Sequence, residues 1–289
     1  MISVLLLGAN GQLGTDVQEV LSNSTHYQVQ AVSRNELDME LTSEVSSYLN
    51  KQNFDVLINC TSYHKTDECE DNPLKTYLIN SVSVAELAKF CYANDKLLFH
   101  ISTDYVFSGR SNVFYTEEDA TRPVNVYGIS KAAGEQAIEA YHDRFFILRV
   151  SSLFGKAGAS GKGGNFVETM IRLAREGKPL KVVSDQYMSP THTLDIAKAI
   201  KSFLDKDVRE YGIYHCSGDG SCSWYEFTIE IFRQLNLNVN LTAVSSSEFV
   251  TKAKRPANSV LSNEKISKIH QMPLWPDALR EYLTRKEYL

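Results

Sequence analysis

A tyrosine and a lysine four positions apart, Tyr127 and Lys131, are the residues of this sequence best suited to carry chemistry. The residues that follow, 132–140, are mostly good helix formers, so the pair should share one face of a helix. An ammonium group beside a phenol favours the phenolate and lowers the tyrosine pKa from its ordinary value of about 10. Such a phenol can pass a proton to a carbonyl oxygen near neutral pH, and the lysine can also hold a cofactor ribose.

The pair gains weight from its place between two expected strands. One strand covers 96–101 and ends in Ser102 and Thr103, and the other covers 145–150. A hydroxyl at the carboxyl end of a strand can polarise the same carbonyl oxygen that the phenol serves. The spacing alone is weak evidence, because the chain has 15 tyrosines and an exposed Tyr–Lys pair on a helix is ordinary.

A glycine-rich turn at the start of the chain indicates a nucleotide cradle. The apolar run 4–7 reads as a buried parallel strand, and Gly8, Gly11 and Gly14 follow it at intervals of three, with an amphipathic helix after them. Such glycines allow a tight turn, the approach of a diphosphate to the backbone, and close packing of helix on strand. The helix N-terminus then offers free N–H groups to phosphate. Asn10 stands where the usual middle glycine would be, and a turn without a ligand is the alternative.

Strand and helix patterns alternate through the first half, which predicts an α/β fold with a Rossmann-type doubly wound parallel sheet. Ligands of such sheets bind beyond the carboxyl ends of the strands, so Gly8, Asn59, Ser102 and Thr103 should face one crevice. The other strands expected in this half cover 27–33 and 55–60, and the other helices cover 44–50 and 82–92.

The second half predicts a smaller C-terminal substrate lobe. We expect residues 1–150 to form the dinucleotide-binding domain, with segments near 190–216 returning to it, and residues 151–289 to form mainly the lobe. The glycine-rich stretch 156–164 is a candidate lid. The helices expected here cover 166–175, 194–204 and, as the last helix, 224–235; the strands cover 180–183 and 212–216.

Composition limits the partners and the compartment. Thirty basic and 35 acidic side chains give a net charge of −5, which argues against a nucleic-acid binder. The five cysteines are odd in number and form no C-x-x-C pair, so free thiols in a reducing cytosol are expected. Met1 leads straight into a strand too short to span a bilayer, so we predict a cytoplasmic protein with no membrane partner.

Several motifs together resemble the extended short-chain dehydrogenase/reductases, and among them the dTDP-4-dehydrorhamnose reductases. The similarity runs through nearly the whole chain. Its most specific parts are the Ser-Thr-Asp-Tyr-Val-Phe run at 102–107 and the Arg-Pro-Ala-Asn-Ser run at 255–259. The glycine turn at 8–14 and the Tyr127–Lys131 pair also match.

The resemblance implies a role for each group. Tyr127 would be the proton donor, Lys131 its partner and Thr103 the third hydrogen-bonding member, with Ser102 as the alternative for that third role. Reduced nicotinamide would deliver hydride to C4 of a 4-keto-6-deoxy sugar held by its nucleotide diphosphate, most closely dTDP-4-dehydrorhamnose. The cofactor residues expected are Gly8, Asn10, Gly11, Gln12, Leu13, Gly14, Arg34, Asp38, Met39, Cys60, Thr61, Ser62, Tyr63, Asn80, Tyr127 and Lys131; the substrate residues expected are Thr103, Asp104, Ser152, Asn165 and Arg255.

Cofactor choice can be read only in part. Arg34, after the second strand, could meet a 2′-phosphate and so favours NADPH, although a solvated surface arginine has similar odds. Glu36 and Asp38 keep NADH open as the alternative. Asp38 and Met39 match family positions that line the adenine.

Some residues depart from the family pattern near the expected sugar pocket. The family usually has a tryptophan where Ser152 stands, and tends to have a glycine where Met188 stands. Some members hold a magnesium with acidic residues at a dimer contact; that set cannot be placed here, and the histidines are scattered, so we predict no metal. A homodimer is a family expectation only.

Two other functions stay open. A related nucleotide-sugar epimerase, or a reductase of another deoxysugar, would keep the fold and change the reaction. A non-catalytic subunit, like the regulatory subunit of methionine adenosyltransferase, would keep the fold alone, although the intact Thr103, Tyr127 and Lys131 argue against it.

Overall fold

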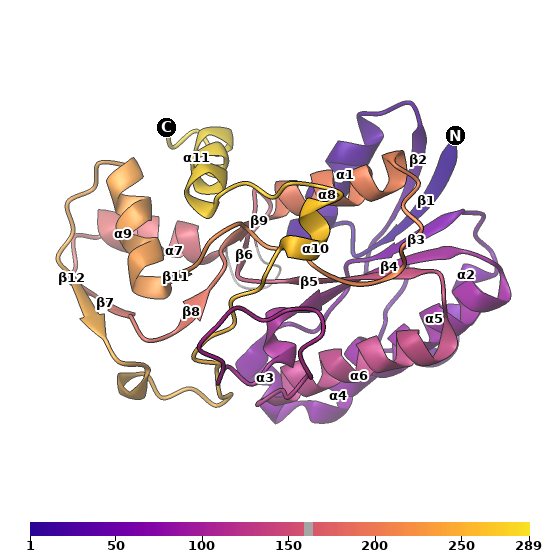
Figure 1. Ribbon diagram of the computed structural model, residues 1–289, viewed down its shortest axis with the longest axis horizontal. Helices are drawn as coiled ribbons and strands as arrows, with labels where there is room; N and C mark the ends of the chain where they lie inside the picture. Colours follow the sequence, from indigo (N-terminus) through magenta and orange to yellow (C-terminus); the bar gives the residue numbers. More distant parts are fainter. Residues whose placement is uncertain (159–163) are drawn as a thin grey trace.

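The fold is built on one parallel sheet, seen in a computed structural model that describes residues 1–158 and 164–289. Six strands lie in the order β10-β5-β4-β3-β1-β2 (Figure 1). All neighbouring pairs run parallel. The strands are β1 (Ile2–Leu7), β2 (Tyr27–Val32), β3 (Val56–Asn59), β4 (Leu97–Thr103), β5 (Phe145–Val150) and β10 (Gly212–His215).

Helices cover both faces of this sheet, as the continuous apolar strands require. Along β1, Val4 and Leu6 face one apolar cluster while Leu5 and Leu7 face the other. The first cluster lies under α1 and α8, and the second under α2, α5 and α6; the two layers are visible above and below the sheet in Figure 1. These helices are α1 (Gln12–Ser22), α2 (Thr42–Leu49), α5 (Ser83–Ala93), α6 (Val126–Tyr141) and α8 (Thr193–Asp205).

The chain reverses its direction of winding between β1 and β3, which lie side by side in the sheet. Such a reversal opens a crevice at the carboxyl ends of the strands, where ligands of doubly wound sheets bind. Gly8 follows β1, Asn59 ends β3 and Thr103 ends β4, so the three residues lie at this edge. The predicted doubly wound fold is therefore confirmed.

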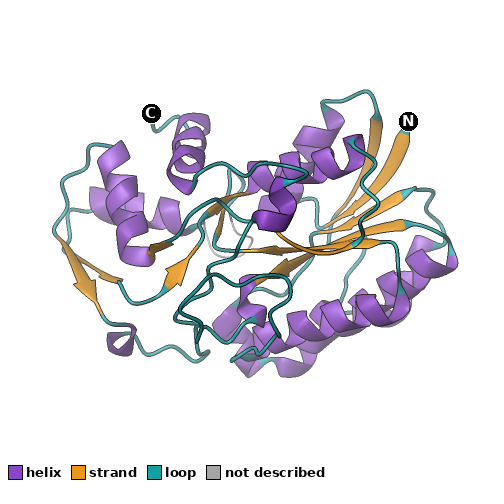
Figure 2. Cartoon of the chain, in the orientation of Figure 1, coloured by secondary structure: helices purple, strands orange, loops and turns teal. Residues whose placement is uncertain are grey.

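A second group of elements forms a smaller body beside the sheet (Figure 2). It has its own apolar cluster, which includes Phe154, Phe227 and Tyr282. Two short pairings accompany it: β7 with β12 in parallel and β8 with β11 in antiparallel orientation. Its elements are α7 (Phe166–Arg175), β7 (Leu180–Val183), β8 (Tyr187–Met188), β11 (Cys222–Ser223), α9 (Trp224–Gln234), β12 (Leu241–Val244), η3 (Ser246–Glu248) and α11 (Trp275–Arg285).

The expectation that the helix near 224–235 is the last one is wrong. α10 (Glu264–Ser267) and α11 follow it, and α11 buries Leu279, Tyr282 and Leu283. Arg285 at the end of α11 bonds Asp16 and Glu19 of α1, so the C-terminal helix is tied to the first helix of the sheet.

Segments of the second half return to the sheet. β10 pairs with β5 at its edge, and α8 packs along α1. β6 (Leu153–Phe154) pairs with β9 (Thr191–His192), which joins the two bodies just after β5. The domain boundary at 150 stays a prediction.

A run of short helices between β3 and α5 escapes the sequence patterns. It consists of α3 (Thr66–Asp71), α4 (Pro73–Tyr77) and the π-helix η1 (Leu78–Val82). Each piece is shorter than the window in which helical periodicity can be recognised. This run matters because it packs on α6, the helix that carries Tyr127.

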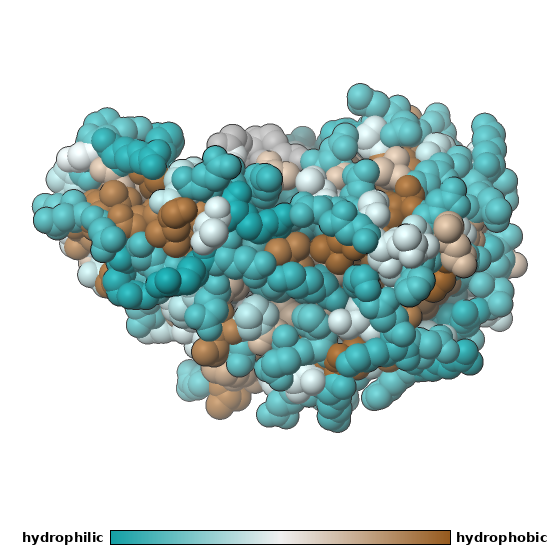
Figure 3. All heavy atoms as spheres, turned by 90° about the horizontal axis from the view of Figure 1, so that it is seen from above, coloured by the Kyte–Doolittle hydropathy of each residue, from teal (hydrophilic) through white to brown (hydrophobic). Residues whose placement is uncertain are grey.

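The surface offers no membrane-crossing element: among the described residues, no helix combines the length and the apolar character needed to cross a bilayer. On the face drawn in Figure 3, apolar side chains lie in separate patches between hydrophilic ones.

Candidate active site

The glycine turn forms a tight cradle at the end of β1. Gly8 has a φ of +77°, and a Cβ there would lie 3.1 Å from the carbonyl carbon of Cys60. A Cβ on Gly14 would lie 2.2 Å from the carbonyl oxygen of Gly8, so α1 can pack this close to the turn only with glycine. α1 begins at Gln12 without a side-chain cap, so the N–H groups of its first turn are available to a diphosphate.

The other predicted residues of this turn divide between surface and core. Asn10 is exposed, whereas Leu13 is buried in the apolar cluster under α1. The Oε1 atom of Gln12 is buried without a hydrogen-bond partner among the described residues. An unpaired buried oxygen beside the cradle can be satisfied by a ligand, which fits a bound dinucleotide.

Helix α6 is held at its start so that Tyr127 lies in its first turn. The side chain of Asn125 caps the helix by accepting from the N–H of Gly128 at 2.7 Å. The carboxylate of Glu70 accepts from the N–H of Val126 at 2.8 Å. These residues were not singled out as site residues, although an asparagine three positions before a glycine at a helix start is a recognisable cap.

The Tyr127 phenol lies against a hydroxyl and a carboxyl from the end of β4. Burial raises the pKa of Tyr127 to about 12, and Asp104 adds to the rise, while hydrogen bonds with Thr103 and Ser62 act the other way. The Thr103 hydroxyl donates to Asp104 at 3.0 Å. Thr103 and Tyr127, predicted from distant parts of the sequence, are thus brought together.

The lysine does not act on the phenol as its spacing suggested. Lys131 is 1% exposed, and its Nζ lies 2.6 Å from the carbonyl oxygen of Ile101 and 2.9 Å from Nε2 of His100. Burial lowers the pKa of Lys131 to about 8. The expected fall in the pKa of Tyr127 is therefore replaced by a rise, because burial and the Asp104 carboxylate act on the phenol while the Lys131 amine is held by Ile101 and His100.

Asp104 is itself perturbed. Burial raises its pKa to about 6, although hydrogen bonds from Ser259, Ser151 and Thr103 oppose the rise. The Ser151 hydroxyl donates to Oδ2 of Asp104 at 2.9 Å. Above pH 6 the carboxylate is charged and disfavours a phenolate on Tyr127, so the phenol keeps its proton near neutral pH.

Ser102, the alternative third member, serves a different network. Its hydroxyl donates to Glu135, whose carboxylate forms a buried ion pair with Arg149 at 2.7 Å. Because this hydroxyl is committed to the ion pair, the geometry favours Thr103 over Ser102 as the partner of Tyr127.

The loop after β3 is braced by Asn80 of η1. The Asn80 carboxamide accepts from the N–H of Tyr63 at 2.9 Å and donates to the carbonyl oxygen of Tyr63 at 3.0 Å. It also accepts from the hydroxyl of Ser62 and donates to Ser130 on α6. Asn80 is 1% exposed, so it fixes the loop after β3 and joins it to α6, the helix that carries Tyr127.

Cys60 lies beside the cradle as a neutral thiol. Burial raises its pKa to about 12, so thiolate chemistry is disfavoured. Cys60 thus borders the cradle as a neutral side chain.

The far end of the expected cofactor site carries an exposed arginine. Arg34 pairs with Asp38 at 3.0 Å and with Glu40 at 3.5 Å. Burial alone would raise the pKa of Asp38, but the N–H of Glu40 and the Arg34 guanidinium hold it below its ordinary value. Met39 is buried next to Asp38. Arg34 is thus placed where a phosphate could replace its carboxylate partners.

A cavity of about 630 Å³ opens between the sheet and the smaller body. It is bordered by Tyr105, whose ring meets the ring of Tyr127 edge-on at 5.9 Å between centroids. Three basic side chains, Arg110, Lys254 and Arg255, lie in its wall. The remaining lining residues are Ser108, Gly109, Val124, Val183, Gln186, Trp224, Ser246, Ser247, Phe249, Thr251 and Ala257.

Arg255 lies in the wall of this cavity. Its Nη2 pairs with Asp67 at 3.0 Å. A guanidinium in the wall of a cavity suits an anionic ligand such as a phosphate. The structure therefore brings Arg255 to the site.

Trp224 also lines the cavity, although it was not predicted as a site residue. It packs on Phe166 at 4.5 Å between ring centroids. Position in the sequence gives no signal for this, because Trp224 comes from α9, far along the chain from the cradle.

Asn165 and Ser152 were predicted to bind the substrate, and the structure shows the local geometry of each. Asn165 caps α7 through a capping box, and its Nδ2 donates to Gly155 at 3.1 Å and to Tyr282 at 3.0 Å. Asn165 is 5% exposed and is thus committed to the cap. Ser152 adopts a φ of +45°, an uncommon value for a non-glycine residue, directly after β5. Of the candidate lid at 156–164, residues 159–163 lie outside the described residues.

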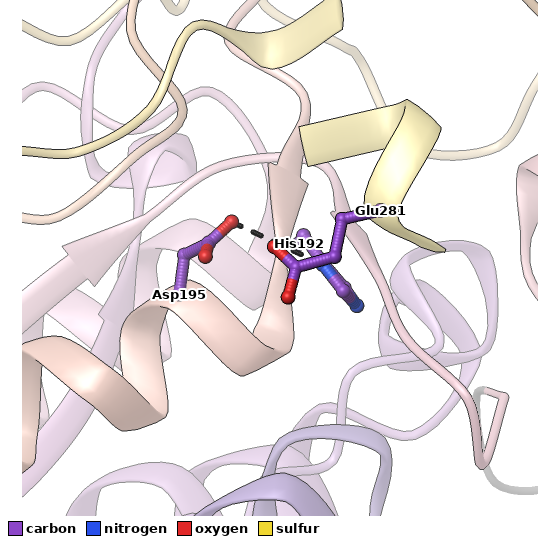
Figure 4. Close-up of side chains that lie close together, drawn as sticks. All are labelled: His192, Asp195 and Glu281. Carbon is purple, nitrogen blue, oxygen red and sulfur yellow. Dashed lines mark ion pairs between the residues drawn. The ribbon is translucent and has the colours of Figure 1, made fainter. Parts of the chain in front are cut away.

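A further polar cluster lies between α8 and α11, where His192, Asp195 and Glu281 offer ligand atoms within 4.8 Å of one another (Figure 4). Lys198 pairs with Asp195 at 3.4 Å and with Glu281 at 3.1 Å. A side-chain ammonium therefore supplies positive charge to both carboxylates. The expected absence of a metal stays a prediction.

Comparison with known proteins identifies the family. The family described as "RmlD substrate binding domain" matches residues 2–288. The chain belongs to this family. It is 36% identical over 287 residues to "Spore coat polysaccharide biosynthesis protein SpsK" of Bacillus subtilis (strain 168), covering 99% of this chain and 98% of that protein. It is also 36% identical to "dTDP-4-dehydrorhamnose reductase" of Aggregatibacter actinomycetemcomitans, over 97% of this chain and 98% of that one.

A solved structure agrees along the same length. The crystal structure of dTDP-4-dehydrorhamnose reductase from Bacillus anthracis str. Ames in complex with NADP has a TM-score of 0.91 and 36% identity, covering 98% of this chain and 99% of that one. The resemblance read from the motifs is therefore confirmed for this RmlD-family chain.

Proposed function

We propose that this RmlD-family protein reduces the 4-keto group of a nucleotide-linked 6-deoxy sugar, dTDP-4-dehydrorhamnose, to give dTDP-L-rhamnose with NADPH as the reductant. One observation carries the proposal. Tyr127 lies beside Thr103 at the carboxyl edge of the sheet, Lys131 follows one helical turn along α6, and Tyr105, which packs on Tyr127, borders a cavity with basic walls. A dinucleotide and a nucleotide diphosphate can each occupy one side of this site.

The cradle suits the cofactor in shape and in donors. The N–H groups at the start of α1 would hold the diphosphate, and the braced loop 60–63 would flank the nicotinamide end. Reduced nicotinamide, when bound, supplies the hydride for the ketone carbon. Every other task in the reaction belongs to side chains of this chain.

Tyr127 would supply the proton. A pKa of about 12 keeps the phenol protonated, and it can donate to the strongly basic oxygen that develops when the ketone accepts hydride. Thr103, which hydrogen bonds with the phenol, would hold the same oxygen. Lys131 would hold the cofactor ribose from one helical turn away.

The cavity would receive the nucleotide diphosphate. Arg255 would donate to the phosphates, with Arg110 and Lys254 adding positive charge. Binding energy from this remote part of the substrate can align the ketone with Tyr127.

Arg34 favours NADPH over NADH, because its guanidinium can exchange Asp38 and Glu40 for a 2′-phosphate. The NADP bound by the Bacillus anthracis relative supports this choice. NADH stays the alternative. A homodimer and a cytoplasmic location also stay predictions.

A substrate panel tests the function. The purified protein is incubated with dTDP-4-dehydrorhamnose and with other nucleotide 4-keto sugars, with NADPH or NADH, and nicotinamide absorbance is followed. We expect fast oxidation of NADPH with dTDP-4-dehydrorhamnose and formation of dTDP-L-rhamnose in equal amount.

Other results would point to the alternative functions. If the protein preferred another 4-keto sugar, that sugar would replace dTDP-4-dehydrorhamnose as the assigned substrate. Such a preference is compatible with Ser152 in place of the family tryptophan. Interconversion of sugars with cofactor that stays bound through purification would indicate an epimerase. No turnover with any sugar would favour a binding subunit.

A further inference from the structure

A continuous chain of buried hydrogen bonds leads from the loop after β3 to Lys131. Thr61 in the loop contacts Asn59, Asn59 contacts His100 of β4, and His100 contacts Lys131. Asn59 and His100 are 0% exposed and Lys131 is 1% exposed. The chain therefore links the cofactor side of the crevice to the catalytic amine through groups shielded from water.

The orientation of the Asn59 carboxamide is fixed by Thr61. The backbone N–H of Thr61 donates to Oδ1 of Asn59 at 3.0 Å, and the Thr61 hydroxyl donates to the same oxygen at 2.5 Å. A backbone N–H can only donate, so the oxygen must face Thr61. The amide nitrogen of Asn59 consequently faces Nδ1 of His100, 3.0 Å away, and donates to it.

This donor decides the form of the histidine. Because Nδ1 accepts from Asn59, a neutral His100 carries its proton on Nε2. Nε2 lies 2.9 Å from Nζ of Lys131 and presents an N–H to it. An ammonium group has no lone pair with which to accept this N–H, whereas a neutral amine has one. The amine keeps its own donors for Ile101, 2.6 Å away.

We propose that His100 is a positioning residue for the reduction, which holds the Lys131 amine against β4 and makes its protonation unfavourable. Its N–H faces the amine and its Nδ1 is anchored through Asn59 to the loop that flanks the cofactor. This role rests on the proposed reductase function. The role also couples the loop after β3 to the charge on Lys131. A shift of Thr61 would release Asn59, and His100 could then take the other tautomer.

The charged groups around Lys131 are consistent with this role. Glu135, one turn along α6, favours the ammonium, but its carboxylate is already paired with Arg149 of β5. Cys60 after β3 lies near the amine as a neutral thiol. The pKa of His100 lies well below its ordinary value because of burial and Lys131, so the imidazole stays neutral and adds no charge.

The experiment measures the charge of Lys131 and the pH profile of the enzyme. In cofactor-free protein labelled with 15N-lysine, the Nζ signal of Lys131, assigned with Lys131→Met, is titrated by NMR. In His100→Gln an amide oxygen can replace the Nε2–H, so we expect the titration midpoint to rise by about one pH unit. The limb of the kcat/KM profile that follows the charge of Lys131 should move in the same direction.

A second variant tests the same effect on the titration midpoint of Lys131 and leaves His100 in place. In Asn59→Ala, Nδ1 loses its donor, the ring can take the other tautomer and Nε2 can accept from an ammonium, so the midpoint should again rise. His142→Gln, at the distant end of α6, serves as the matched control and should leave it unchanged.

A merely structural role would lower the melting temperature in the variants and leave the midpoint of Lys131 where it is in the wild type; that result would overturn the proposal. If His100→Gln does not fold, Asn59→Ala decides by the same measurement. The NMR titration needs no turnover, so a protein that reduces no nucleotide sugar would refute the proposed function while the test of His100 still stands.

Discussion

The two halves of the site are built in different ways. The region proposed for the cofactor is backbone: a turn at Gly8, a helix packed on it at Gly14, and the loop after β3 close against Gly8. The region proposed for the sugar is made of side chains that come from separate segments between Tyr105 and Ala257. A backbone cradle needs a local sequence with glycine at fixed places, whereas a side-chain wall can be assembled from any part of the chain.

The difference predicts different responses to mutation. A change in the cradle alters geometry that no other side chain can restore, so binding should fail outright. A change in the wall removes one contact among several, so binding should weaken and the substrate preference should change. Tyr127, Thr103 and Lys131 lie where the halves meet, and changes there should affect turnover more than binding.

The largest effect is expected from Gly14→Val. Even the Cβ would lie 2.2 Å from the carbonyl oxygen of Gly8, so α1 must move away from the turn. We expect loss of measurable NADPH binding in fluorescence titration, with a lowered melting temperature. Gln18→Ala, on the exposed side of the same helix, should bind NADPH as the wild type does. Normal NADPH affinity in Gly14→Val would refute a backbone-built cradle.

Tyr127→Phe should lower kcat by at least about 100-fold, because the proton donor is lost while the ring is kept. The KM for the sugar and for NADPH should change little, which a steady-state analysis measures. Tyr141→Phe, on an exposed part of the same helix, is the control. Unchanged turnover in Tyr127→Phe would remove this residue from its role.

The same division explains what the sequence could and could not predict. The cradle and the strand ends lie in contiguous or periodic patterns, so the sheet and its class were predicted correctly, while the roles of the site residues stay predictions. Apart from Arg255, the cavity wall was not predicted, because residues such as Trp224 and Lys254 reach it only through the packing of the smaller body. Sequence distance carries no signal for such contacts.

The electrostatics of the site were the least predictable part. The spacing of Tyr127 and Lys131 indicated a lowered phenol pKa, yet burial raises it to about 12. A helix spacing specifies which side chains share a face, but not how much water reaches them. The neighbour of Lys131, His100, comes from β4, and no pattern in the sequence joins the two.

In the sugar half, Arg255→Ala should raise the KM for the nucleotide sugar by about 10- to 100-fold, the range for a lost hydrogen bond to a charged group. The KM for NADPH should stay the same, because Arg255 lies in the cavity wall. Lys252→Ala is the control, since Lys252 is exposed and pairs with Asp71 outside the wall. A rise in the NADPH KM instead would mean that the two halves are not separate.

Asp195, a buried carboxyl outside both halves of the site, should affect the stability of the fold and not the binding of either ligand. Burial raises the pKa of Asp195 from 3.8 to about 6, and its Oδ2 has no hydrogen-bond partner among the described residues. The folded state therefore binds a proton more tightly than the unfolded state does, so stability should fall as pH rises from about 4 to about 6. The loss attributable to Asp195 is on the order of 3 kcal/mol.

Asp195→Asn should remove this contribution, so the difference in unfolding free energy between variant and wild type should shift in favour of the variant as pH rises through that window. Urea unfolding at several pH values measures it. The KM values for sugar and NADPH should not change at either end of the range. A pH-independent difference would contradict the raised pKa, and altered KM values would tie this cluster to the site.

The smallest effect is expected at the outer end of the cofactor half, where the contact is a side chain and not backbone. Arg34→Ala should raise the KM for NADPH by about 10-fold, because one exposed charge-assisted contact with the 2′-phosphate is lost. The KM for NADH should stay constant or fall, since that cofactor has no phosphate at this position and Asp38 is released from Arg34. The ratio of the two KM values is its own control for folding and for the cradle. An equal change for both cofactors would mean that Arg34 acts only by holding Asp38 and Glu40, and the cofactor half would then discriminate through backbone alone.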